Sequence, residues 1–84
     1  MENPEAYKAS KLPVITSTVL SLLPDLSPAT RARLLDDQTP EELIMYCKQK
    51  FDEEFDLHFE ALGAAGASEV AWHEVFYDFS DDNG

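Results

Sequence analysis

The side chains that could do chemistry in this chain are two histidines, one cysteine and a set of carboxylates. His58 follows Glu54 by four residues and His73 follows Glu69 by four, so on a helix each pair would share a face and could chelate a metal ion. Zinc needs four ligands, however, and Cys47 is the only thiol. The Glu-x-x-His and His-Glu-x-x-His spacings of helical metal sites are absent. We therefore expect no metal and no cofactor, with His58 at the edge of the core and His73 exposed.

No catalytic motif accompanies these residues. The chain has neither a glycine-rich phosphate loop nor a Gly-x-Ser-x-Gly turn. Cys47 falls on an apolar helical stripe, where a thiol is usually inert. We expect a protein that is not an enzyme.

The carboxylates are the most distinctive feature because of where they lie. The chain holds 17 Asp and Glu against six Lys and Arg, a net charge of −11, and every Lys and Arg lies at or before Lys50. Residues 51–84 hold ten carboxylates and no Lys or Arg. A field of this sign attracts cationic partners and repels nucleic acid and anionic membranes.

Helical periodicity indicates how these side chains are positioned. We predict an all-α fold, a small bundle of three to four helices with one long central amphipathic helix over residues 40–62. The start of this helix is marked by a capping box of Thr39 and Glu42, with Pro40 at the first position. Its buried stripe would consist of Ile44, Cys47, Phe51, Phe55, His58, Phe59 and Leu62.

Three shorter segments complete the expected bundle. Residues 10–23 read as a helix with Pro13 in its first turn, although the β-branched run within residues 14–20 leaves a strand open. Ser27 would cap a helix over residues 29–37. Gly63 would end the central helix, Gly66 would stop any continuation, and a last helix would cover residues 69–79. The phenylalanine and tryptophan side chains of this last helix are expected mostly in the core; they are Trp72, Phe76 and Phe79.

The domain organisation follows from these segments. Residues 1–9 are expected to be a disordered tail, residues 10–79 a single helical domain, and residues 80–84 an acidic tail. The acidic beginning of the chain has no apolar run like that of a signal peptide, and no stretch is apolar enough to span a membrane, so we expect a cytoplasmic protein without a membrane partner.

The predicted function is a small acidic module that docks on a basic surface of a partner protein and inhibits or regulates it. Glu53, Asp56 and Glu60 have no Lys or Arg four residues away. Asp52 and Asp56 are a like-charge pair one turn apart, which costs stability and favours a role for the field. In the extreme form the carboxylates would mimic nucleic acid and occupy the groove of a nucleic-acid-binding protein. The predicted partner-binding residues are Asp52, Glu53, Asp56, Glu60, Glu74, Tyr77 and Asp78.

Two alternatives compete with this prediction. A solvated helix face is the ordinary fate of a charge run. Alternatively, Tyr46 and Leu57, which lie off the buried stripe, would form an apolar patch through which a structural subunit assembles, for example as a homodimer.

Overall fold

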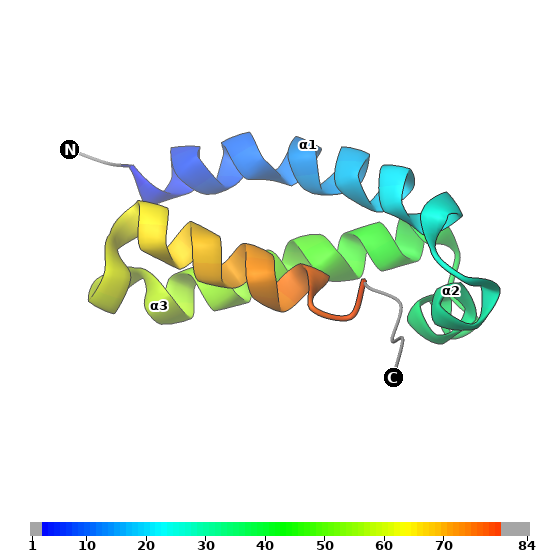
Figure 1. Cartoon of the computed structure of the whole chain (residues 1–84). Coiled ribbons are helices and arrows are strands. Elements are labelled where there is room, and N and C mark those ends of the chain that lie inside the picture. The colour runs from blue at the N-terminus through cyan, green and yellow to red at the C-terminus, as the bar shows by residue number, and fades with distance from the viewer. Residues whose placement is uncertain (1–2, 80–84) are drawn as a thin grey trace.

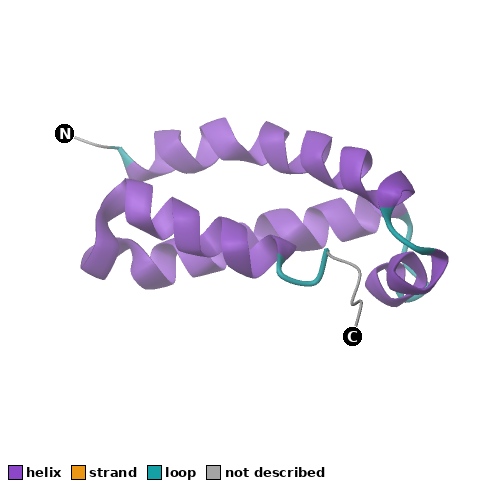
Figure 2. Cartoon of the chain, viewed as in Figure 1, coloured by secondary structure: helices purple, strands orange, loops and turns teal. Residues whose placement is uncertain are grey.

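Helices make up almost all of residues 3–79, the part of the chain that the computed structural model describes. The order is α1 (Pro4–Leu22), a short 3-10 helix η1 (Leu23–Asp25), α2 (Pro28–Leu35) and α3 (Pro40–Phe76). Figure 1 shows α3 reversing direction part-way, so that its two arms run antiparallel and α1 lies alongside them. Short loops join the helices, and residues 3–79 contain no strand (Figure 2). The prediction of a small all-α bundle is confirmed.

The amino-terminal helix begins earlier than we predicted. Asn3 caps α1 by accepting hydrogen bonds from the amides of Glu5 and Ala6 at 3.0 and 3.3 Å, and Pro4 occupies the first turn. The expected disordered tail is therefore wrong for residues 4–9, while residues 1–2 lie outside the description. Pro13 consequently lies inside the helix and not in its first turn; it is exposed, so the missing hydrogen bond faces solvent.

Residues 14–20 are helical, which rejects the strand alternative. Ile15 and Val19, one turn apart, are both fully buried against the rest of the core. Packing of this pair therefore outweighs the β-branched bias of the segment.

The two starts predicted after α1 are confirmed. Ser27 Oγ accepts from the Thr30 amide at 3.3 Å, and at Thr39 both hydrogen bonds of the capping box with Glu42 form, at 2.9 and 3.2 Å. Helix α2 ends two residues before the predicted boundary. Asp36 and Asp37 adopt positive φ angles of 44° and 68°, a conformation that Asp tolerates better than most residues.

Gly63 makes the reversal within α3. Its φ of 76° and ψ of 178° separate a first arm, residues 40–62, from a second arm, residues 64–76. We expected Gly66 to end the helix and a last helix to start at residue 69, and both expectations are wrong. Residue 66 is helical, the second arm starts before residue 69, and Ser68 is buried within that arm. A Cβ at position 66 would come within 2.8 Å of Leu62 Cβ, so this glycine permits a close approach across the turn and does not end a helix.

The core lies between the two arms and α1. Phe51, Phe55 and Cys47 are almost completely buried, as predicted, and Phe59, Trp72 and Phe76 pack partly buried against them. Leu62 was predicted in the buried stripe but is 49% exposed. It directly precedes the reversal, where the first arm ends.

Substituting Gly63 tests this reversal. The combination of φ and ψ at Gly63 is essentially restricted to glycine, so Gly63→Ala is expected to reduce the free energy of unfolding by about 1–3 kcal/mol in urea titrations. The strain comes from the backbone alone, since nothing lies within 4 Å of where a Cβ would be. A chemically synthesised chain with D-alanine at position 63 should keep its stability. A stable L-alanine variant would contradict the described turn.

Candidate functional site

The face of the first arm that points away from the core carries the candidate site. Phe51 and Phe55 point inward, and residues about half a turn away point outward. We call one continuous row on that face the outer stripe. All six of its residues are exposed and follow one another at spacings of three or four; they are Glu42, Tyr46, Gln49, Glu53, Leu57 and Glu60.

Beside this stripe, Asp52 and Asp56 are bound by a lysine from the other end of the chain. Lys8 Nζ lies 2.6 Å from Asp52 Oδ1, 3.0 Å from Asp56 Oδ1 and 3.6 Å from Glu5 Oε1. The same amino group stands 5.7 Å from the centre of the Phe55 ring. The side chain of Lys8 is only 9% exposed, whereas those of Asp52 and Asp56 are 54% and 63% exposed. These two predicted docking residues therefore fasten α1 to α3.

Glu53 and Glu60, by contrast, have no cation close to them. Within residues 3–79, Lys8 is the only lysine or arginine that comes within 4 Å of a carboxylate. Glu53 accepts a 3.3 Å hydrogen bond from Gln49 Nε2, which is neutral. These two carboxylates thus lie outside any ion pair of the described residues, on a helical face that is exposed to solvent.

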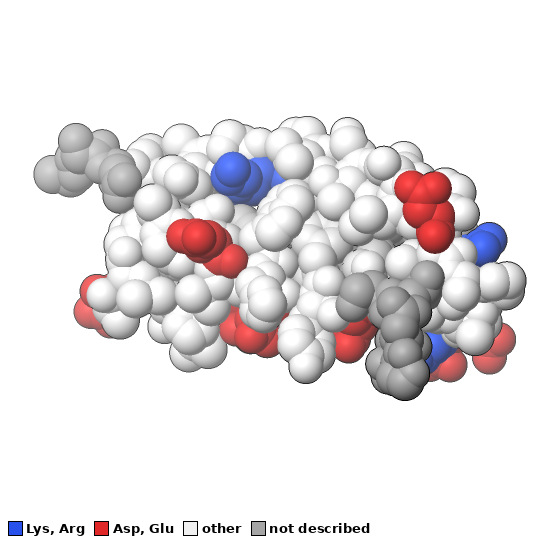
Figure 3. Space-filling view, in the orientation of Figure 1, with Lys and Arg blue, Asp and Glu red and all other residues white. Residues whose placement is uncertain are grey.

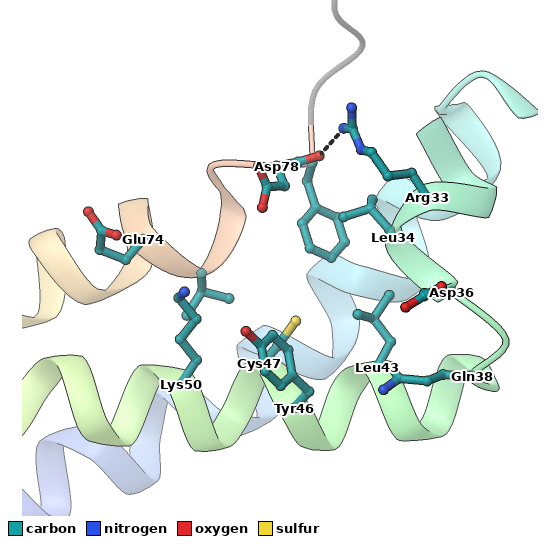
Figure 4. Close-up of a pocket in the computed structure, with 12 residues that line it drawn as sticks. Arg33, Leu34, Asp36, Gln38, Leu43, Tyr46, Cys47, Lys50, Glu74 and Asp78 are labelled. Carbon is teal, nitrogen blue, oxygen red and sulfur yellow. Dashed lines mark hydrogen bonds between the residues drawn. The ribbon is translucent and has the colours of Figure 1, made fainter. Parts of the chain in front are cut away.

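Glu74 and Asp78 lie at a different place, along a cleft between the second arm, α2 and the start of α3. The cleft has a volume of about 400 Å³ and an apolar lining that includes Leu43 and Val75. Figure 4 shows Arg33 reaching from α2 to the main-chain oxygen of Asp78, at 3.2 Å, and Lys50 rising from the first arm. This cleft therefore presents both signs of charge, and Tyr46 of the outer stripe is one of its lining residues.

The predicted apolar anchor Tyr77 is exposed. Its side chain is 68% accessible, and its ring lies edge-on to His73, with centroids 5.8 Å apart. Six of the seven predicted residues thus form three separate pairs, and Tyr77 belongs to none of them. On the face seen in Figure 3 the carboxylates likewise appear as separate groups, several of them along the lower margin of the view.

The histidines and the cysteine occupy positions that fit the sequence expectations. His58 is half-buried, 3.6 Å from Glu54 Oε1, and His73 is exposed. No group of three or more His, Cys, Asp or Glu within residues 3–79 could hold a metal ion. Cys47 is 2% exposed, and burial raises the pKa of its thiol to about 11, so little of the reactive thiolate is present near neutral pH.

Comparison with known proteins adds no relative to this geometry. No family model, curated protein or solved structure matches the chain. Among the described residues, no helix has the length and apolar character required to traverse a bilayer. The interpretation of the site therefore depends on its own contacts.

Two features of the site were missed from the sequence. Lys8 was assigned to a tail, although Asn3-Pro4 repeats the cap-and-proline pattern of Ser27-Pro28 and Thr39-Pro40 and could have revealed the helix that positions it. The alignment of Tyr46 and Leu57 with Glu53 is visible in the spacing of the sequence. This alignment becomes apparent when the buried residues of the helix are set aside and only the exposed ones are compared.

Proposed function

We propose that this protein is a small acidic binding module that docks the outer stripe of α3 on a basic surface of a partner protein and thereby inhibits or regulates that partner. The proposal depends on one observation, which is that Glu53 and Glu60 are exposed and form no ion pair among the described residues. Both are exposed on a helix that packs on a buried core, and within residues 3–79 neither has a lysine, arginine or histidine within 4 Å. Charges held in this way steer a cationic partner and set its orientation.

The nucleic-acid-mimic form of this function has weaker support. Each strand of duplex DNA carries one phosphate per roughly 3.4 Å of axis. Asp52 and Asp56 share Lys8, which leaves Glu53 and Glu60, seven residues or about 10 Å apart along the helix axis. This spacing suits a few discrete lysines or arginines on a protein surface better than a groove built for a phosphate backbone.

A charge-matched pair of variants tests the location of the docking surface. With poly-L-lysine as the probe, Glu53→Lys/Glu60→Lys is expected to weaken binding roughly tenfold, or about 1.4 kcal/mol. The control Asp25→Lys/Glu69→Lys changes the net charge equally at two exposed carboxylates outside the stripe, and it should weaken binding less. Circular dichroism should show equal helicity in all three proteins. Equal losses in both variants would mean that only net charge matters and would refute the docking surface.

Self-association is the second candidate function, and the exposure of Tyr46 (54%) and Leu57 (70%) favours it. Because Glu53 lies between them, two copies would bring like charges together. Sedimentation at low and high salt separates the two functions, since apolar assembly survives salt whereas charge-driven docking weakens with it. A dimer that persists in high salt and disappears in Leu57→Ser would favour assembly.

A further inference from the structure

The outer stripe combines charge with two apolar side chains in a fixed register. Tyr46 and Leu57 are 11 residues apart, which is about three helical turns, so they point in nearly the same direction. Glu53 lies between them and Glu60 lies one turn beyond Leu57. Both apolar residues are more than half exposed, and Tyr46 also borders the cleft described above. Between Tyr46 and Glu60 the stripe therefore alternates apolar and acidic side chains, with the neutral Gln49 between Tyr46 and Glu53.

From this row we infer that the partner presents a basic amphipathic α-helix, which lies lengthwise along the outer stripe. The inference depends on the proposed docking function and specifies the element that the stripe recognises. Tyr46 and Leu57 would each contact an apolar side chain of the partner helix, while Glu53 and Glu60 would face its lysines or arginines.

The distance between the two apolar residues decides for a helix. Along the axis they are separated by about 16 Å. A partner helix crosses this distance in 11 residues, and its residues i and i+11 point to the same side, as at Tyr46 and Leu57. A β-strand crosses it in about five residues, and residues i and i+5 of a strand point to opposite faces. Only a helix can thus offer both contacts in register at a shallow crossing angle.

The negative charge of this chain argues against a second copy of it as the partner on the outer stripe. A copy laid along the stripe would oppose Glu53 and Glu60 with carboxylates of its own, and each chain carries a net charge of −11. A partner helix with a basic residue four or seven positions from its first apolar residue, according to its direction, places a cation opposite Glu53. Tyrosine in such a row is a typical interface anchor, because it buries a large ring and keeps a polar tip.

Two synthetic peptides of equal composition test this inference. Both are about 18 residues long and rich in alanine, with lysines four and seven positions after the first leucine. In the in-register peptide the two leucines are 11 residues apart, and in the shifted peptide the second leucine is moved by two residues to another face. By fluorescence anisotropy, the protein is expected to bind the in-register peptide roughly tenfold more tightly.

Two matched variants test whether Leu57 causes the difference in affinity between the two peptides. Leu57→Ser should remove the difference between the peptides, whereas Leu20→Ser, at another exposed leucine on α1, should leave it intact. If both peptides bind equally and Glu53→Lys/Glu60→Lys weakens both, the docking function stands and the helix inference fails. If neither peptide binds, both fail.

Discussion

Replacing Phe55 by alanine is expected to remove about 3–5 kcal/mol from the free energy of unfolding. Phe55 is fully buried, and its ring lies 6.2 Å from Tyr7, 6.1 Å from Phe51 and 5.6 Å from Phe59, measured between ring centres. A domain of this length is typically stable by roughly 4–12 kcal/mol. The variant is therefore expected to unfold at a much lower urea concentration, or to populate the unfolded state in water.

Leu57→Ala is the matched control for this prediction. Leu57 lies two residues away on the same arm and is 70% exposed, so its truncation should change stability by less than about 0.5 kcal/mol. Urea titration followed by circular dichroism measures both variants. A loss below about 1 kcal/mol for Phe55→Ala would mean that α1 does not pack on this aromatic row as described.

Lys8→Met is expected to be the most destabilising change among the charged residues. The methionine keeps much of the volume of the side chain but leaves Asp52 and Asp56 one turn apart without the cation between them. Removing one partner of a buried ion pair typically lowers the free energy of unfolding by about 3–5 kcal/mol. Because both carboxylates are more than half exposed and can be solvated, we expect a smaller loss of about 1–3 kcal/mol for Lys8→Met.

A double-mutant cycle separates this pairing from simple packing. If the loss arises from the unpaired carboxylates, Asp52→Asn/Asp56→Asn should restore much of the stability in the Lys8→Met background. Lys11→Met serves as the control, since Lys11 is on the same helix and pairs with no carboxylate in residues 3–79. Equal losses for Lys8→Met and Lys11→Met would refute a specific role of Lys8.

The dependence of stability on pH above neutrality gives a second test of the ion pairs of Lys8. The hydrogen bond from Lys8 to Asp52 holds the pKa of the ammonium above its ordinary value of about 10.4, although burial acts in the opposite direction. The stabilisation is therefore complete below about pH 10 and is lost as the pH rises further. Cys47 contributes with the same sign, because burial raises the pKa of its thiol to about 11. Stability should fall above roughly pH 9, and above pH 10 it should fall less in Lys8→Met.

Local signals in the sequence predicted much of this fold. Three helix boundaries depend on interactions between residues that are close in the sequence, so the spacing of residues was enough to predict them. They are the capping box at Thr39, the cap at Ser27 and the end of the first arm at Gly63. The buried row of Phe51 and Phe55 follows in the same way from helical periodicity.

The pairing of Lys8 with Asp56 could not be predicted in this way. The two residues are 48 positions apart, and no local pattern in the sequence specifies how α1 lies on α3. The sequence therefore indicated which carboxylates face outward, but not that Asp52 and Asp56 share a cation while Glu53 and Glu60 have none. That distinction is made by tertiary packing, and it limits the docking surface that we propose to one stripe.

The single-residue reversal at Gly63 also bears on the order of folding. Next to Gly63 the two arms of α3 bring together residues that are close in the chain, such as Leu62 and Gly66, so little loop entropy is lost when this end of the hairpin forms. Contacts of α1 such as Lys8 with Asp56 close a loop of nearly 50 residues. The end of the hairpin next to Gly63 can consequently form with a smaller loss of loop entropy than the contact of Lys8 with Asp56.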